Sequence, residues 1–574
     1  MPSTRIERVD DLPLILTWLL NMHVSGIIDG IWHAHGQWQG LSYGKLALLF
    51  VAYVIHQRSH RLMTMEGWLN DHRMVIEQVT GWSIRQKEAT DDRIGLLLDE
   101  LGYSEEKGGI LQQRLGEHII QAYELPTEVA RYDTTSFSVH HAVPEPGEPQ
   151  RELLRFGHSK DNQPSLLQFK QGLGTLDPAG IPILTQTLSG EVADDGLYLP
   201  AWQQMGVTLK RTDFLFVADC KAAALETRAG IATQQGFYLF PLPMTGETPA
   251  WLQERIDQAT TQEIVLPEVV DSSGQPKVLG KGFTIVRTMT YTRPDQSLFT
   301  WEEQWFVTRS QSLTARQQAS LQRRLGRTAE DLRRLRPKKD ESLPAFTHRA
   351  HQILSKRHMA EFLQVKVDEI ITTRKRYLKP GRHGPDSPFT METNSRISLT
   401  VERDEQAVAT ARELAGWRIH VSNTSSQRMD LLGSVRYYRD EWLVEHGIHR
   451  FKKGDLPALP LYLHLPDRIR GLMLLLLIAL QALTLIDFVA QRSLAEEKTS
   501  IAGLVPGNPK MKTDHPSAER LLAAFDKLHL VISETDDLAS GYLLEPLSPL
   551  QSFILQLLHL SPSIYTLTFD HVPI

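Results

Sequence analysis

Two aspartates lie where a sheet could bring two carboxylates together. Asp133 interrupts EVARYDTTSFSVH (residues 128–140), whose alternation predicts a strand, and Asp219 follows the apolar run that begins FLFVADC (residues 214–220). Carboxylates on neighbouring strands raise each other's pKa unless a cation lies between them. Mg²⁺ accepts oxygen ligands and needs only two or three protein carboxylates. The pair therefore indicates a divalent-metal site. The alternatives are a strand-edge or turn residue at Asp133 and a helix N-cap at Asp219.

A third acid is expected from residues 428–453, which the sequence predicts to be one long helix. Glu445 lies seven residues after Tyr438 and seven before Lys452, and seven residues are close to two helical turns, so the three share one stripe. Glu441 lies one turn before Glu445 and is its chief rival. The alternative for Glu445 is a solvated helix face. For Lys452 it is a favourable interaction with the negative end of the helix.

The elements that must position these acids change type near residue 128. Residues 12–125 have apolar residues at helical spacing and predict a compact helical domain. Several strands are expected after it, and a helix is expected between the last two. The predicted strands are 128–140, LLRFGHSK (153–160), IPILTQTLSG (181–190), FLFVADC and FYLFPLP (237–243). This order indicates an α/β layer.

The α/β pattern of strands and helices is interrupted between about residues 245 and 410. A β-hairpin is expected from GKGFTIVRTMTYT and TWEEQWFVTRS (residues 280–292 and 300–310), and an Arg-rich helix after it. Core structure resumes with the strand GWRIHVSN (residues 416–423). We therefore expect an inserted domain, part β and part α. Trp301 and Trp305, in TWEEQWF, are expected in the core, with base stacking as the alternative.

Composition, cysteine content, apolar stretches and charge limit the classes of protein to which the chain can belong. The chain has 574 residues, 41% hydrophobic and 23% charged, which is ordinary for a soluble multidomain protein. A single cysteine, Cys220, excludes a disulfide framework, and the N-terminus lacks a signal-peptide pattern, so a cytoplasmic location is expected. The apolar stretch 470–492 is expected to be a buried core helix rather than a membrane span. Residues 309–382 carry 19 Lys and Arg against 7 Asp and Glu, a footprint of polyanion contact or a solvated surface.

Five stretches together resemble the bacterial insertion-sequence DDE transposases of the cut-and-paste group, whose last acid lies in a Y-x2-R-x3-E-x6-K signature. YRDEWLVEHGIHRFKK matches at Tyr438, Glu445 and Lys452, and has Glu441 where the family has arginine. RYDTTS and FLFVADC resemble the two aspartate strands of that family. FGHSKDNQP (residues 156–164) resembles its G-x-SKD-x-RP element, and GIPILTQTLSGEVAD resembles the strand that follows.

The resemblance implies an α/β fold: an RNase H-like catalytic core interrupted by an α+β insertion, with helical N-terminal and C-terminal domains. Asp219 and Glu445 lie 226 positions apart, which leaves room for that insertion. The expected boundaries are a helical N-terminal domain at 1–125, the core at 126–245 and 411–495, the insertion at 246–410, and a helical C-terminal tail at 496–574.

The implied activity is metal-dependent DNA cleavage and strand transfer at the ends of an insertion sequence. Asp133, Asp219 and Glu445 would be catalytic and would hold Mg²⁺ or Mn²⁺, two ions in the expected arrangement. The expected DNA contacts are Tyr438, Arg439, Lys452, Lys160 and Ser159, although Ser159 and Lys160 also fit a simple polar turn. The expected partners are double-stranded DNA, as terminal inverted repeats and target, and a second copy in a homodimer; no membrane is expected. The alternatives are a nuclease without strand transfer and an inactive DNA-binding derivative.

Overall fold

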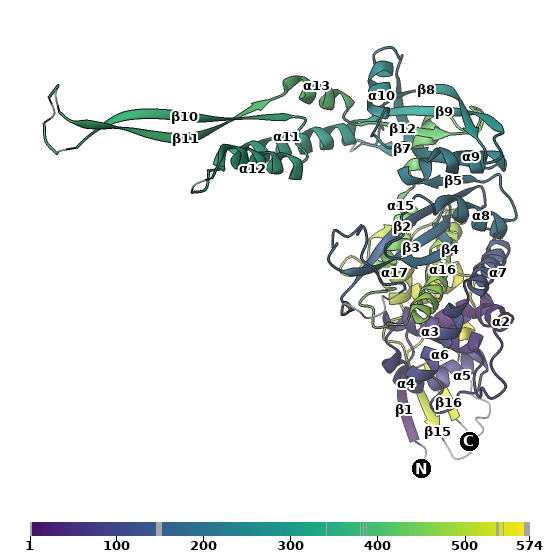
Figure 1. Ribbon diagram of the computed structural model, residues 1–574. Helices are drawn as coiled ribbons and strands as arrows, with labels where there is room; N and C mark the ends of the chain where they lie inside the picture. Colours follow the sequence, from purple (N-terminus) through teal and green to yellow (C-terminus); the bar gives the residue numbers. More distant parts are fainter. Residues whose placement is uncertain are drawn as a thin grey trace.

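The computed structural model describes residues 3–144, 152–271, 273–339, 341–378, 380–382, 384–385, 387–534, 539–543 and 545–566. Figure 1 shows three parts: a largely helical part that contains both ends of the chain, a sheet in the middle, and a long two-stranded arm that projects away from both. The middle part contains the predicted acids.

Nine of the described strands form one mixed sheet, and the fold is therefore mixed α/β. Their order across the sheet is β4 (Ile181–Ser189), β3 (Leu167–Leu176), β2 (Val129–Val139), β5 (Leu215–Ala218), β6 (Phe237–Pro241), β12 (Trp417–Ser422), β9 (Leu298–Ser310), β8 (Pro276–Thr292) and β7 (Gln262–Val270). The first three are antiparallel, and β5 and β6 run parallel to β2. β12 pairs antiparallel with both β6 and β9, and so joins the two halves of the sheet.

The second strand of the sheet is not the predicted one. Residues 153–160 form no strand beyond an isolated bridge from Arg155 to Gln168, and β3 lies further along the chain. LQFKQGLGTL has Thr175 as its single β-branched residue, which is a weak strand signal, yet all ten of its residues are buried. Its glycines are needed for packing, because a Cβ at Gly172 would collide with the Tyr132 side chain. Tertiary packing outweighs local propensity here.

Helices cover the faces of the sheet. α7 (Glu105–Tyr123), α8 (Tyr198–Leu209) and α16 (Pro466–Glu496) pack on β4, and α15 (Trp442–Lys452) packs on β2 and β3. The connection from β5 to β6 contains the 3-10 turn η1 (Cys220–Ala223) and α9 (Leu225–Thr233). α14 (Leu431–Arg439) lies between β12 and α15 in the chain.

Among the described helices, α16 is long and apolar enough to cross a membrane by length and composition alone. Of its most apolar stretch, 94% is buried inside the protein, where it packs against α6 (Asp91–Tyr103), α3 (Tyr43–Gln57) and β4. A helix that is apolar on every side is expected when neighbours surround it completely. The structure supports the prediction of a core helix.

The two ends of the chain share one core. The N-terminal part contains α3, α6, α7, β1 (Ser3–Arg8), α1 (Leu12–Asn21), α2 (Val24–Asp29), α4 (Leu62–Asp71) and α5 (Arg73–Thr80). The C-terminal part contains β13 (Ile501–Ala502), β14 (Lys512–Thr513), α17 (Ala518–Ala523), β15 (His529–Glu534), β16 (Ala539–Leu543), α18 (Pro549–Leu557) and η2 (Pro562–Tyr565).

The expectation of a helical tail is wrong in one respect. β15 pairs antiparallel with β16 and, across the whole length of the chain, with β1. Buried residues of both ends, including Leu12 and Phe525, belong to the same hydrophobic cluster. Such pairing between distant strands leaves no local signal, because each strand is short and its partner is more than 500 residues away.

The region from 246 to 410 divides between the sheet and the arm. α10 (Thr248–Ile256) is followed by β7, β8 and β9, and the expected hairpin of β8 with β9 is present. These strands extend the central sheet. The remainder is α11 (Gln311–Arg334), α12 (Leu343–Lys356), α13 (Glu405–Leu414) and the arm strands β10 (Leu363–Tyr377) and β11 (Phe389–Arg403), which pair only with each other.

Two tryptophans of β9 contribute to a buried polar cluster. The Trp305 side chain is buried and its Nε1 donates to Glu303 Oε2 at 3.0 Å, while Trp301 Nε1 donates to the Tyr238 hydroxyl at 2.9 Å. Arg228 donates to both carboxylate oxygens of the fully buried Glu303 at 2.7 Å. These contacts favour the core assignment over base stacking.

Candidate active site

The two aspartates are neighbours in the sheet. β2 and β5 run parallel, and Tyr132 is paired with Ala218, so the residues that follow them, Asp133 and Asp219, occupy adjacent positions. Every other residue of β2 is buried, whereas Asp133 is half-buried with 22% of its side chain exposed. Asp219 begins where β5 ends. Its side chain also accepts the backbone N–H of Lys221, so it caps the following turn as well.

The expected single helix over 428–453 is two helices. α14 ends at Arg439 and α15 begins at Trp442, with Asp440 and Glu441 at the break. Glu445 lies in the first turn of α15 and Glu441 is its N-cap residue. The break contains no proline or glycine, the usual signals of a helix end, so it could not be predicted from the residues alone. α15 packs on β3 and on β2, the strand that contains Asp133 (Figure 1).

The carboxylates lie close enough to influence one another's ionisation. Burial raises the pKa of Asp133 to about 6, and the charges of Asp219 and Glu445 add to this effect. Burial likewise raises the pKa of Glu441 to about 8, with contributions from Asp133, Asp219 and Glu445. Four acids therefore share one electrostatic environment. This coupling is what a cation site requires, because a bound cation would relieve the repulsion.

Lys160 provides a positive charge beside the aspartates. Its Nζ donates to the Thr134 carbonyl oxygen at 2.5 Å and to the Thr134 hydroxyl at 2.7 Å. The same nitrogen is 3.7 Å from Asp133 Oδ1 and 3.6 Å from Asp194 Oδ2. The ammonium group opposes the rise in the pKa of Asp133. Lys160 was predicted to contact DNA, and here it lies beside the candidate metal ligands.

Ser159 and Lys452 organise the same loop. Ser159 is buried, and its hydroxyl accepts the backbone N–H groups of Asp161 and Gln163, both at 3.2 Å. Lys452, in the last turn of α15, donates to both carboxylate oxygens of Asp161 at 2.7 and 2.9 Å. The loop is thereby tied to α15. In this arrangement Ser159 shapes the turn, and Lys452 is paired with a carboxylate.

Tyr438 and Arg439 are the last two residues of α14, and their surroundings differ. The Tyr438 ring lies against His420, with 4.3 Å between ring centroids. Burial raises the pKa of Tyr438, and the charges of Glu441 and Asp219 raise it further, so its hydroxyl lies within the electrostatic field of these acids. Arg439 is exposed. The two predicted DNA-binding residues therefore differ in their accessibility to a ligand.

Sequence reasoning missed two residues that hold the acids in place. Arg131 is completely buried; it forms two 2.7 Å hydrogen bonds with Asp177, and its Nη1 is 3.5 Å from Glu441 Oε2. The Tyr198 hydroxyl donates to Asp219 Oδ1 at 2.5 Å. A signal for Arg131 existed: it lies two positions before Asp133 in a buried strand and hence on the same face. Tyr198 gave none.

The acids offer oxygen ligands only, which suits Mg²⁺ or Mn²⁺. Glu441 Oε2 is buried and accepts no hydrogen bond, so it retains the capacity to bind a cation. Within the described part of the chain, however, no three His, Cys, Asp or Glu side chains are gathered tightly enough to hold one ion. The chemistry of the donors fits a divalent cation, and closer approach of the acids would accompany binding.

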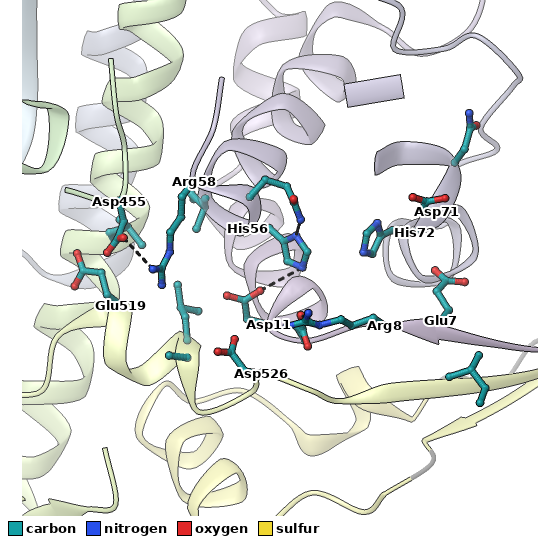
Figure 2. Close-up of a pocket in the computed structure, with 18 residues that line it drawn as sticks. Glu7, Arg8, Asp11, His56, Arg58, Asp71, His72, Asp455, Glu519 and Asp526 are labelled. Carbon is teal, nitrogen blue, oxygen red and sulfur yellow. Dashed lines mark hydrogen bonds and ion pairs between the residues drawn. The ribbon is translucent and has the colours of Figure 1, made fainter. Parts of the chain in front are cut away.

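A large cavity lies elsewhere, where the two ends of the chain meet. Figure 2 shows its lining, which combines side chains of the N-terminal helices with Asp455, Glu519 and Asp526 from the second half of the chain. Its volume is about 680 Å³. Inside it, His56 Nε2 lies 3.7 Å from Asp11 Oδ1. None of the predicted site residues lines this cavity.

The buried position of Asp11 in this cavity predicts how the stability of the protein depends on pH. Burial, with Asp10 and Asp526 nearby, raises the pKa of Asp11 to about 8, so the folded state binds this proton more tightly than the unfolded state does. The free energy of unfolding should therefore fall between about pH 4 and pH 8. Asp11→Asn removes the group whose ionisation lowers the stability. The Asp11 side chain makes no capping hydrogen bond, so the substitution breaks none. We expect the variant to be more stable than the wild type at pH 8.5 by roughly 1–3 kcal/mol.

Urea unfolding of the two proteins at pH 4.5 and pH 8.5 measures this difference. Asp71→Asn, at an exposed position on the rim of the same cavity, is the matched control and should leave both curves unchanged. Equal stability of Asp11→Asn and the wild type at pH 8.5 would contradict the assignment.

Comparisons with known proteins add little to this geometry. No family model matches the sequence, and no curated protein matches it. In structure the chain is similar to one in the "Cryo-EM structure of piggyBac transposase synaptic complex with hairpin DNA (SNHP)", with a TM-score of 0.23 and 11% sequence identity. The similarity covers 50% of this chain and 57% of that chain. This TM-score is too low to define a shared fold, and the strand order defines the mixed α/β fold.

Proposed function

We propose that this protein is a DDE transposase that cleaves DNA and transfers strands at the ends of an insertion sequence. The observation that supports it most strongly is the placement of Asp133 and Asp219 at adjacent positions of parallel strands, with α15 packed on β2 and Glu445 close enough to affect the ionisation of Asp133. The five strands from β4 to β6 have the order and directions that we assign to an RNase H-like core.

In this proposal Asp133, Asp219 and Glu445 hold two Mg²⁺ or Mn²⁺ ions, and Glu441 is the neighbouring acid. Such ions activate a water or a 3′-hydroxyl and stabilise the leaving oxygen of an in-line displacement. The protein's contribution is positioning and charge neutralisation. Tyr198 orients the Asp219 carboxylate through its 2.5 Å hydrogen bond, and Lys160 supplies a positive charge 3.7 Å from Asp133.

The DNA contacts belong to the same proposal. Tyr438, Arg439, Lys160 and Lys452 border the acids or lie on the helices that carry them. Lys452 would exchange its ion pair with Asp161 for a phosphate, and an exchange of one anion for another costs little at a partly exposed site. Two DNA ends held together by a homodimer complete the proposed reaction.

An assay with a DNA duplex that carries the insertion-sequence end tests the function. We expect Mg²⁺-dependent release of a 3′-hydroxyl at the end and joining of that end to a second duplex, both abolished by EDTA. Cleavage without joining would identify a nuclease on the same core. Binding without either reaction, at any Mg²⁺ or Mn²⁺ concentration, would contradict the proposed activity.

A further inference from the structure

The arm formed by β10 and β11 extends beyond the body that supports it (Figure 1). The strands pair without interruption from Leu363 with Arg403 to Tyr377 with Phe389. Fifteen residues at about 3.3 Å each give a length of roughly 50 Å. Only the base of the arm is covered, where Val365 and Val401 pack against the core of α11 and α12. An uncovered two-stranded ribbon is marginally stable in water, so its outer half is suited to a partner.

The outer half of the arm is basic within an acidic protein. Residues 370–396 contain six Lys and Arg against two Asp and Glu, whereas the whole chain has a formal net charge of −6. This thin, projecting element thus carries a local excess of four positive charges. A local basic stripe in an acidic protein is typical of a site for a polyanion.

One face of the ribbon presents three arginines in a row. Paired residues share a face, and the register places Arg374 opposite Glu392, Arg376 opposite Thr390, and Arg396 opposite Ile370. The pair Thr372 and Asn394, whose short side chains also bind phosphates, lies between Arg396 and Arg374 on the same face. The three arginines span six residues of the ribbon, roughly 20 Å. That spacing suits successive phosphates of a nucleic acid backbone.

The arginines are available to a ligand. Arg374 and Arg376 have 72% and 71% of their side chains exposed, although both lie near Glu392. Exposed ion pairs of this kind contribute at most about 1 kcal/mol, so a phosphate can displace the carboxylate at small cost. At the tip, Leu378 is 62% exposed and Met391 is 58% exposed. Apolar side chains at the tip of a DNA-binding element commonly insert against base steps in the minor groove.

We propose that the arm is a DNA-binding element that grips a duplex, with Arg374, Arg376 and Arg396 on phosphates and the apolar tip in the groove. The inference rests on the proposed function for its choice of DNA, and it deepens that function by assigning a contact far from the catalytic acids. A face that combines arginines with threonine and asparagine favours DNA over a second copy of this chain as the occupant.

The test measures binding of a fluorescent 30-base-pair duplex to the full-length protein in EDTA, so that no cleavage contributes. We expect Arg374→Gln/Arg376→Gln/Arg396→Gln to bind ten- to a hundredfold more weakly at 0.1 M salt. Each lost phosphate contact lowers the slope of log affinity against log salt by about 0.9, so the slope should fall by roughly 3. The matched control replaces three exposed lysines of the body with glutamine: Lys87, Lys107 and Lys510.

Leu378→Ser separates the apolar contact from the charges. It should weaken binding three- to tenfold with the salt slope unchanged, because no ionic contact is lost. If the triple arginine variant binds like its lysine control while the wild type binds DNA, the arm inference is overturned and the proposed function stands. The same result with a loss of dimer in sedimentation would make the arm a contact between protein copies. If the wild type binds no DNA, the proposed function itself fails.

Discussion

Asp133→Asn should abolish metal-dependent cleavage of DNA while leaving DNA binding intact. The substitution removes the charge that the proposed metal site needs and keeps the size of the side chain. We expect the cleavage rate to fall at least about a thousandfold, which corresponds to roughly 4 kcal/mol of lost transition-state stabilisation. Single-turnover cleavage of the end duplex in Mg²⁺ measures the rate, and a binding titration in EDTA measures affinity.

Unfolding of the variant is not expected to explain that loss. Burial and neighbouring acids raise the pKa of Asp133 to about 6, so the folded protein carries its charge at a cost, and asparagine should leave the thermal midpoint equal or higher. Asp213→Asn, in an exposed pair with Arg211, is the matched control and should retain full activity. Equal loss of binding and cleavage in Asp133→Asn would count against a catalytic role.

The third acid can be assigned by the same assay. Glu445 lies in the first turn of α15, whereas Glu441 is at the N-cap position and its Oε2 lies 3.5 Å from Arg131 Nη1. We expect Glu445→Gln to lose cleavage as completely as Asp133→Asn, and Glu441→Gln to lose less. The reverse order would assign the metal ligand to Glu441.

The sequence predicted that Asp133 and Asp219 lie side by side, because the signals for their strands are local. Asp133 stands out as a carboxylate in an otherwise buried strand, and Asp219 directly follows a short apolar one. Their adjacency then required only that the two strands be parallel neighbours, which the α/β pattern favours. A helix that contains Glu445 was expected after the last core strand, and α15 packs on β2, the strand of Asp133.

The parts that could not be predicted depend on contacts between distant residues. β3 has weak strand propensity and is held by burial on both sides. The pairing of β1 with β15 joins residues more than 500 positions apart. The basic character of the insertion was evident, but the position of part of that charge on a projecting ribbon was not, because charge counts along a sequence do not show which element leaves the body.

Arg131→Met should destabilise the protein by about 3–5 kcal/mol, the cost expected when one partner of a buried ion pair is removed. Arg131 is completely buried between Asp177 and Glu441, and its loss leaves two largely buried carboxylates without a counter-charge. Arg131 also lowers the pKa of Glu441, which is nevertheless about 8. Without the arginine this pKa should rise further. The destabilisation should therefore be larger at pH 8.5, where the carboxylate is charged, than at pH 5.5, where Glu441 is neutral in the folded state.

Urea unfolding at the two pH values measures this effect, and a second variant shows its origin. Arg131→Met/Glu441→Gln should recover part of the stability lost at pH 8.5, because the glutamine carries no charge that needs a partner. Arg211→Met removes a surface arginine that also binds an aspartate through two nitrogens, and it should cost no more than about 1 kcal/mol. If Arg131→Met were no more harmful than Arg211→Met, the buried pair would not be what fixes Glu441 beside the aspartates, and the electrostatic coupling of the four acids would need another support.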